Sequence, residues 1–570
     1  METLNSSEFS KLLNLPDPIA ELSINDTLEV SHRGFKFDLR IKNCIFKEFV
    51  TFKDCRFFKS LFFENCTFEK GLLFNTVEVI GSFDLLSNSF NNELIFKNCT
   101  FSQFSSKETH YKQVLFCGYL RNNAIKNEDV LFENSFFTTI SFNDLECHKN
   151  IRLKDIKTDS LEIYRSNFYS EISLGDFEGE NYFFCDNVYI ESSKFLQRID
   201  FYNGKIEETL YIHKVEFEEQ VVISKEIDIH SISFNEVRAK HNVSIYFYDS
   251  FEYLRFSDCW FNTSLTVHNF DKLTSYSKSV NIDFDGVIYG NYIIEEIPTI
   301  SIHMSCINFG NIIFHNIDTK FITLNRFFNY NKLFFNSIRY NIILNILVIF
   351  DSNIGNTEFE NIDFRKFNEV VVVKSDVSSM LLTNSLFPKE IQIKTETPRL
   401  GYEIPELEKI NDNMYFRDSY RQLKVAMEKM GNRYYSLIYK SKEMYYQRRE
   451  LKWGPDKILL YINYLSNNNG ISWMRGITFT LSCAFISFVL LNFQLHEPLF
   501  YWTIKTTKPE CIEAFKIGFK SYISFISSFP ILKLDYLKEN WVVDMIKLLS
   551  RILISVGIYQ TIVAFRKYGK

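Results

Sequence analysis

Four cysteines near the N-terminus are the residues whose type and spacing could carry chemistry. Cys44, Cys55 and Cys66 are eleven residues apart, and Cys99 lies three such intervals further on. Cysteine thiolates bind zinc, and in oxidising compartments cysteines form disulfides. Zinc sites, however, pair cysteines two to four residues apart, and this chain contains no such pair. A regular interval of eleven points instead to one repeated packing unit.

The redox state of the cysteines follows from the N-terminal segment. METLNSSEFSKLLNLPDP has neither a basic region nor an apolar run, so it does not resemble a secretion signal. We therefore expect the bulk of the chain in the cytosol, where the eleven cysteines are reduced thiols. Free cysteine packs as a small hydrophobic side chain. We interpret the cysteines as fillers of a narrow buried position and expect no metal site, no cofactor and no catalytic residue among them.

Large apolar residues recur at the same interval of eleven. Each unit reads h-x-h-x-x-s-x-h followed by three polar residues, where h is large and apolar and s is small. This alternation is typical of a short strand, and Asn-rich turns separate the units. An eleven-residue repeat can also mark a helical coiled coil, but Phe, Ile, Asn and Thr are poor helix formers. The main column is Ile41, Phe52, Phe63, Phe74, Leu85 and Phe96, then Ile190, Phe201, Ile212, Ile223, Phe234, Ile245, Phe256 and Val267, with later blocks at Ile302, Ile313, Leu324, Phe335 and Ile346 and at Phe359, Val370 and Leu381.

The repeats predict a mainly β fold, a solenoid over residues 30–395 preceded by a cap or leader at 1–29. With two units in each turn of about 22 residues, this range contains about 16 turns. The stretches DCRF, NCTF, NCIF and DCWF resemble the pentapeptide-repeat family, in which a small residue stands two positions before an inward Phe or Leu. This resemblance implies a right-handed β-helix. Here the Asp or Asn comes before the small residue, whereas in the family it follows it.

The composition changes after residue 400, which predicts a helical adaptor at 396–470. Residues 414–452 are rich in Leu, Met, Ala, Lys, Arg and Glu, which are good helix formers. Gly431 and Asn432 supply the end of one helix and the start of another. We therefore expect an α-helical hairpin at this point of the chain.

Residues 471–570 are predicted to be a membrane module. The stretch 476–493 contains eighteen uncharged residues in a row, enough to cross a bilayer. We expect transmembrane helices at about 473–494 and 543–565, with a re-entrant or interfacial segment at about 514–532 between them. A helix buried in the core of a soluble protein is the alternative to the first span, and the second carries Asp544, Lys547 and Arg551 in its first half.

This arrangement resembles bacterial pentapeptide-repeat proteins that carry a helical hairpin and a two-helix, channel-like region. The stretch YRQLK at 420–424 carries the resemblance most specifically. The resemblance implies a pore, and a two-helix pore requires a homo-oligomer. A potassium filter needs T-x-G-Y-G, which this chain lacks, so we do not expect potassium selectivity. The candidate pore or membrane-site residues are Ser524, Ser527, Ser528, Phe529, Pro530, Arg551 and Gln560.

Composition narrows the function classes. The net charge of −6 gives no attraction for nucleic acid, so we expect no nucleic-acid partner. Phosphate-binding loops and nucleophile motifs are absent from the sequence, and we expect no enzyme; an enzyme with a site on the solenoid flank is the least favoured reading. Two hypotheses stay open: a scaffold or sensor coupled to a pore, and a membrane-tethered scaffold without conduction. We expect a multi-pass protein of the inner cell membrane, with its N-terminal domain and C-terminus cytosolic, that contacts membrane lipid and binds a protein partner through the β-helix surface.

Overall fold

A computed structural model describes the chain as two compact units. The first comprises Met1–Val371 and Ser379–Ile393, and the second comprises Val372–Ser378 and Lys394–Lys570. The expected boundary at 395–396 lies outside the described residues. The described residues are 2–121, 130–175, 182–224, 226–247, 251–269, 280–297, 300–340, 345–391, 413–495, 508–534, 537 and 540–565.

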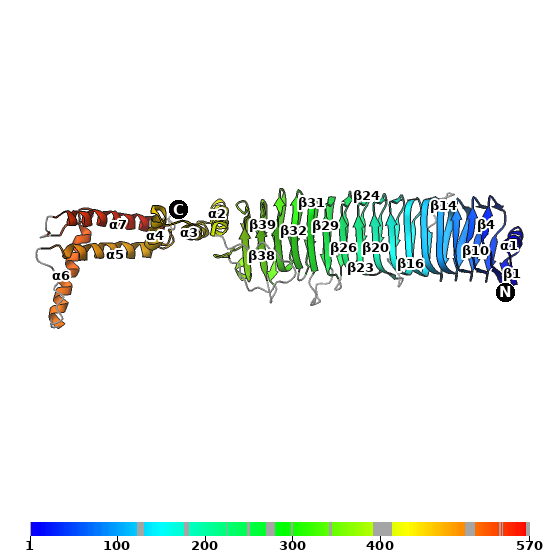
Figure 1. Ribbon diagram of the computed structural model, residues 1–570, viewed down its shortest axis with the longest axis horizontal. Helices are drawn as coiled ribbons and strands as arrows, with labels where there is room; N and C mark the ends of the chain where they lie inside the picture. Colours follow the sequence, from blue (N-terminus) through cyan, green and yellow to red (C-terminus); the bar gives the residue numbers. More distant parts are fainter. Residues whose placement is uncertain are drawn as a thin grey trace. The chain divides into compact units, whose positions relative to one another are not determined.

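The first unit is a parallel β-solenoid of about 16 turns, as the repeat predicts (Figure 1). In its first coils, strands pair with strands 22 residues further on, as Leu39 pairs with Leu61 and Leu61 with Phe83. Each of these turns contains four short strands, because two eleven-residue units each supply one longer and one shorter strand. The strands of this region are β1 (Glu2–Leu4), β2 (Ile19–Ala20), β3 (Leu22–Ile24), β4 (Leu28–Ser31), β5 (Gly34–Phe35), β6 (Leu39–Lys42), β7 (Ile45–Phe46), β8 (Val50–Lys53), β9 (Arg56–Phe57), β10 (Leu61–Glu64), β11 (Thr67–Phe68) and β12 (Gly71–Asn75).

Further along the chain, several strands continue around a corner and are longer. All strands of this part of the solenoid, short ones included, are β13 (Glu78–Leu86), β14 (Ser89–Lys107), β15 (His110–Arg121), β16 (Val130–Cys147), β17 (Ile151–Tyr164), β18 (Asn167–Phe168), β19 (Ile172–Leu174), β20 (Phe183–Glu191), β21 (Lys194–Phe195), β22 (Ile199–Phe201), β23 (Gly204–His213), β24 (Glu216–Phe217), β25 (Val221–Ile223), β26 (Ile227–Asn235), β27 (Arg238–Ala239), β28 (Val243–Phe247), β29 (Tyr253–Ser257), β30 (Trp260–Asn269), β31 (Val280–Glu295), β32 (Ile300–Asn308), β33 (Asn311–His315), β34 (Asp318–Asn325), β35 (Phe328–Asn329), β36 (Lys332–Asn336), β37 (Arg339–Tyr340), β38 (Ile346–Phe350), β39 (Asn356–Glu360), β40 (Glu369–Val373) and β41 (Leu381–Thr383), with a 3-10 helix, η1, at Phe364–Lys366.

Near the N-terminus, residues 2–24 contain one helix and the strands β1 to β3 of the first coil. Helix α1 (Ser6–Leu12) begins at Asn5, whose side chain accepts a hydrogen bond from the backbone N–H of Glu8 at 2.9 Å. Phe9 is fully buried, and its ring packs edge-on against Phe46 at 5.6 Å. The helix therefore covers apolar side chains that the first turn would otherwise expose to water.

The corners of the solenoid explain why Asp or Asn precedes the small residue. Residues at an interval of eleven have φ between 50° and 56°, the left-handed region that Asn and Asp adopt more readily than other non-glycine residues. The next residue then turns into the core. The residues that form these corners in the first coils are Asn43, Asp54, Asn65, Thr76, Ser87 and Asn98.

The apolar columns form the core of the solenoid. The predicted column from Ile41 to Phe96 and the column from Ile190 to Val267 are buried along their whole length. Rings in equivalent positions stack at the spacing of the coils, as Phe46 stacks on Phe68 at 4.7 Å. Two predicted core positions are wrong: Ile313 is only half buried and Leu381 is exposed. A coil of 20 residues ends at Ile313 and one of 23 residues ends at Leu381, and a slip of one residue turns a strand side chain to the opposite face.

The evenly spaced cysteines, Cys44, Cys55, Cys66 and Cys99, are buried packing residues, which confirms the interpretation of their spacing. Cys55 is 2% exposed, and its Sγ donates to the carbonyl oxygens of Val30 at 3.3 Å and Lys53 at 3.4 Å. Cys66 and Cys99 make the same pair of contacts one and four units further on. The single S–H of each thiol is therefore shared between two backbone carbonyls at a corner, one of which also accepts a backbone N–H, in addition to filling space.

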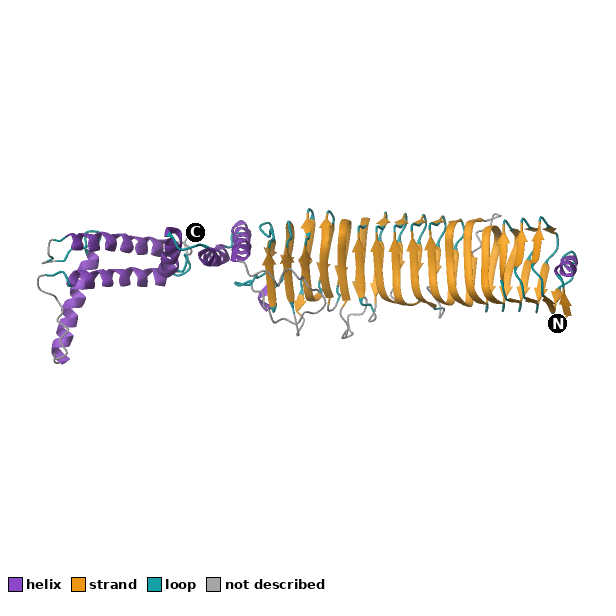
Figure 2. Cartoon of the chain, viewed as in Figure 1, coloured by secondary structure: helices purple, strands orange, loops and turns teal. Residues whose placement is uncertain are grey.

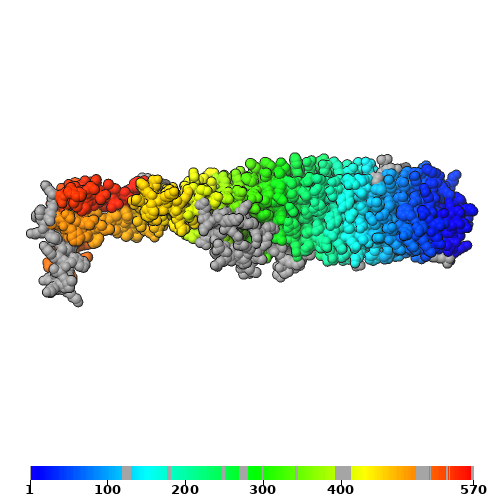
Figure 3. All heavy atoms as spheres, viewed as in Figure 1, coloured from blue at the N-terminus to red at the C-terminus, as the bar shows by residue number. Residues whose placement is uncertain are grey.

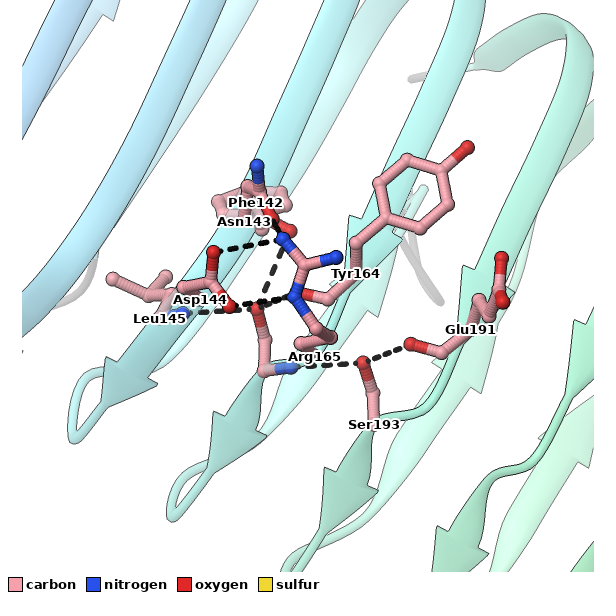
Figure 4. A network of polar contacts seen from close by, with 9 residues as sticks. Phe142, Asn143, Asp144, Leu145, Tyr164, Arg165, Glu191 and Ser193 are labelled. Atoms are coloured by element: carbon pink, nitrogen blue, oxygen red, sulfur yellow. Dashed lines mark hydrogen bonds and ion pairs between the residues drawn. The ribbon is translucent and has the colours of Figure 1, made fainter.

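Serine takes the same position in later coils (Figure 4). Ser166 follows a left-handed corner residue, and its Oγ donates to the carbonyl oxygen of Tyr164 at 2.7 Å and accepts from the backbone N–H of Leu145 at 3.1 Å. Its own backbone N–H donates to Oγ of Ser193, which donates to the carbonyl oxygen of Glu191. Cysteine and serine both occupy this position, and Val77, Val215 and Val237 occupy it at other corners, so thiol chemistry is not what it requires.

The second unit is helical. The hairpin helices α2 and α3 pack against each other through Tyr420 and Tyr446, whose rings stack at 5.6 Å, and through an ion pair of Lys424 with Glu443 at 2.8 Å. Asn432 caps the second of them by accepting from the N–H of Tyr435. The helices are α2 (Asn413–Lys429), α3 (Arg433–Glu450), α4 (Pro455–Asn467), α5 (Trp473–Asn492), α6 (Lys508–Ser527) and α7 (Trp541–Phe565).

Candidate membrane module and solenoid surface

Helices α5 and α7 are long and apolar enough to cross a membrane. With 20 residues, α5 is about 30 Å long, the thickness of a bilayer's hydrocarbon core. Only 28% of the apolar stretch of α5 and 22% of that of α7 is buried, whereas the core helix of a soluble protein is mostly buried. Among the described helices, these two alone meet the length and composition of a span.

The two helices pack closely because small residues face each other. A Cβ added at Gly476 would lie 3.0 Å from Cα of Thr561, and one added at Gly557 would lie 3.1 Å from Cα of Thr480. Each threonine hydroxyl donates to the carbonyl oxygen of the glycine one turn before it in its own helix, at 2.8 Å. Two G-x-x-x-T stretches therefore meet in antiparallel orientation, the small-residue contact typical of membrane helix pairs. The space-filling view shows α5 (orange) and α7 (red) side by side (Figure 3).

The candidate residue Gln560 joins α7 to α4. Its Oε1 accepts from Nδ2 of Asn467 at 2.6 Å, and its Nε2 donates to Oδ1 of Asn463 at 2.6 Å. Nδ2 of Asn467 also donates to the backbone carbonyl oxygen of Gln560. The structure thus gives Gln560 a role in holding the end of the helix pair.

The other six candidates meet at the opposite end of the pair. Arg551 of α7 donates from Nη2 to the carbonyl oxygen of Ile531 at 3.0 Å, directly after Phe529 and Pro530. The hydroxyls of Ser527 and Ser528 donate to carbonyl oxygens of Ser524 and Phe525 in their own helix. The turn at the end of α6 therefore lies beside α7, where a backbone carbonyl accepts a hydrogen bond from the guanidinium of Arg551.

A buried arginine between α3 and α4 was not anticipated from the sequence. Arg448 is 7% exposed, and its guanidinium carbon lies 4.3 Å from the ring centroid of Tyr464 and 4.8 Å from that of Tyr461. Cation–π contacts of this kind are strongest when water is excluded. The spacing of Tyr461 and Tyr464 on one helical face was the available signal, but the arginine partner comes from another helix.

The solenoid exposes a column of aromatic rings on one side. Trp260, Tyr289, Phe309 and Tyr330 stack at centroid distances of 5.2, 5.3 and 5.1 Å, and all four are exposed. Ile307 and Phe328 extend the apolar surface on neighbouring coils. The segments 287–294 and 307–314 contain no charged residue. Contiguous exposed apolar surface of this kind marks sites of interaction.

Burial makes the enclosed solenoid thiols unreactive. It raises the pKa of the Cys99, Cys147 and Cys259 thiols to about 12. Across the described ranges, no group of three or more His, Cys, Asp or Glu side chains could hold a metal ion.

Comparisons with family models, curated proteins and solved structures find no match to this chain. The fold therefore defines the class: a parallel β-solenoid followed by a helical unit with two candidate membrane spans.

Proposed function

We propose that this chain is a membrane-tethered interaction scaffold. Helices α5 and α7 cross a bilayer as an antiparallel pair, and the solenoid binds a protein partner. The observation that carries the proposal is the exposure of the two apolar helices, because side chains such as Phe485, Leu490, Leu549 and Ile552 face outward from the pair. Lipid chains provide the apolar surroundings that these side chains lack in water.

The geometry of the helix pair supports a topology in which the start of α5 and the end of α7 lie on the same side of the membrane. The ring of Trp473 at the start of α5 stacks on that of Phe565 at the end of α7 at 5.0 Å. The chain therefore enters and leaves the bilayer on the same side. Lysines and arginines flank this end in the sequence, at Arg475 and in the stretch RKYGK, which supports a cytosolic location for it at the inner cell membrane.

The partner surface of the proposed scaffold is the aromatic column from Trp260 to Tyr330. Aromatic side chains supply large contact areas and are enriched at protein interfaces. The uncharged segments around Tyr289 and Phe309 favour a protein segment with apolar side chains over a charged polymer.

Alkaline extraction of membranes from cells that make the full-length chain tests the anchor. We expect the chain to stay in the membrane pellet and a variant with Ile486→Arg and Leu490→Arg to be released. Both residues are exposed on α5, so the substitutions leave the contact of Gly476 with Thr561 intact. Release of the unaltered chain would defeat the proposal. The matched control is Ile80→Arg, an exposed apolar residue of the solenoid, which should leave the chain in the pellet.

Conduction is a second candidate function, supported by the contact between Arg551 and the turn after Ser528. A pore of this type requires several copies, because one helix pair encloses no channel. Single-channel recordings of the reconstituted full-length chain test it, and Ser527→Leu should alter the conductance. Current recordings without channel openings, with and without the partner, would exclude conduction and keep the scaffold function as the proposal.

We also propose that the solenoid is related to pentapeptide-repeat proteins. Four short strands in each early turn and a small buried residue two positions before an inward Phe support it, as at Cys55 and Phe57. Two features would distinguish this chain from other members of that family. Each early turn has 22 residues, and the Asp or Asn at the corner comes before the small residue.

A further inference from the structure

We propose that α6 lies along the lipid–water boundary, with one face among the acyl chains and the other among the headgroups. The inference rests on the proposed membrane anchor. It assigns a lipid surface as the partner of a helix that α5 and α7 cover only at one end.

The apolar face of α6 is a stripe at helical spacing. Ile512, Phe515, Phe519 and Ile523 follow one another at intervals of three, four and four residues. They are 59%, 68%, 54% and 51% exposed. In an amphipathic helix this spacing places all four side chains on one side. Such a stripe, exposed on an isolated molecule, is the feature by which interfacial helices bind lipid.

The polar face of α6 lies beside the stripe, about 100° around the helix axis by the repeat of 3.6 residues per turn. Glu513, Lys516 and Lys520 are exposed, and Ser524 continues the same side one turn further on. Charges on one side and aromatic or aliphatic side chains on the other are typical of a helix that lies in the membrane surface. A helix that crosses the bilayer would carry these charges into the hydrocarbon core.

Contacts with the membrane pair fix only the C-terminal part of α6. Phe525 is fully buried and its ring lies 5.8 Å from that of Phe488. The hydroxyl of Tyr522 donates to the carbonyl oxygen of Leu481 at 2.6 Å. The rest of the helix projects from the pair, as Figure 2 shows. Most of the apolar stripe, from Ile512 to Phe519, therefore lies on the part of α6 that projects from the pair.

The end of the helix pair at which α6 lies has the composition of a membrane boundary. Asp544 and Lys547 lie in the first two turns of α7, and Trp541 at its start is 73% exposed. Tryptophan and charged side chains gather at the level of the headgroups. The apolar stripe and these boundary residues of α7 lie at the same end of the helix pair. This arrangement favours lipid, and not a second copy of the chain, as the partner of the stripe.

Site-specific quenching in vesicles tests the inference. The full-length chain, with Cys117, Cys483 and Cys511 replaced by Ala, is reconstituted into phosphatidylcholine–phosphatidylglycerol vesicles. Other described cysteines are buried. A fluorophore is attached at Phe515→Cys or Phe519→Cys, and in matched controls on the polar face at Lys516→Cys or Lys520→Cys. A fifth variant, Ile486→Cys, reports the span α5.

We expect lipids with a spin label in the acyl chain to quench the fluorophore at 515 and 519 several-fold more strongly than at 516 and 520. Aqueous iodide should show the opposite order. Equal iodide quenching on both faces, with 486 still protected, would overturn the interfacial helix and leave the anchor standing. Protection of 515 and 519 from both quenchers would assign the stripe to a second copy and also overturn it. Iodide access to 486 would defeat the anchor itself.

Discussion

The position of Cys55 offers the most informative substitution in the solenoid. Cys55→Ser keeps a donor of similar size, and Ser166 shows that a hydroxyl makes the same kind of corner contact at 2.7 Å. Cys55→Ala removes the donor, and Cys55→Leu adds volume beside Phe52 and Phe57, whose rings are already in contact at 6.0 Å. The three variants therefore separate a packing role from a chemical one.

The expected magnitudes follow from these contacts. The serine variant should lose less than about 1 kcal/mol, because both carbonyls keep a partner. The alanine variant should lose about 1–2 kcal/mol, since one buried heavy atom and one hydrogen bond are removed. The leucine variant should lose about 1–3 kcal/mol through overpacking.

Amide hydrogen exchange of β8 to β10 in the full-length chain measures these losses locally, which suits a repeat fold that opens in parts. Stability in the order Ser above Ala and Leu is expected. Loss of the fold in the serine variant, or release of bound zinc from the unaltered chain, would refute the packing account and restore a chemical role for the thiol.

Other substitutions test separate contacts. Asn65→Gly should be tolerated, and Asn65→Val should cost about 1–2 kcal/mol at its left-handed corner, measured by urea unfolding. Gly557→Leu should push α7 away from Thr480 and cost about 1–3 kcal/mol in detergent, whereas Ile558→Leu on the exposed side should be silent. Phe309→Ser should abolish partner binding and change stability by less than about 0.5 kcal/mol, with exposed Phe136→Ser as the control that retains binding. Because burial raises the pKa of Cys259 to about 12, its thiol stays protonated in the folded chain where an unfolded thiol ionises, near pH 8.5. The contribution of Cys259 to stability should therefore be constant below that pH and decrease above it, and Cys259→Ser should weaken the loss of stability in an alkaline unfolding series.

Short-range patterns in the sequence predict most of the solenoid. The interval of eleven places residues such as Phe63 and Phe74 in the core, because each lies on a strand whose alternation repeats without interruption. Ile313 is misplaced because coil length changes before it, and nothing local marks a coil that is shorter by one or two residues. The donor role of Cys55 is also invisible locally, since its acceptor at Val30 belongs to the preceding turn.

In the helical unit too, local sequence predicts the helices but not the contacts between them. Runs of apolar residues predict α5 and α7 within two residues at every end. The contact of Gly476 with Thr561 joins helices that are far apart in the sequence, and the bonds of Gln560 to α4 do as well. The segment expected at 514–532 is a helix from Lys508 to Ser527, because its amphipathic pattern begins earlier than its apolar run.

Labelling from the two sides of the membrane tests the central claim that α5 and α7 span a bilayer. Single cysteines at Ser472 and Gln494, which flank α5, are exposed to a membrane-impermeant maleimide in sealed vesicles of both orientations. The account predicts that 472 reacts from the cytosolic face alone and 494 from the opposite face alone. Reaction of both positions from the same face would contradict it.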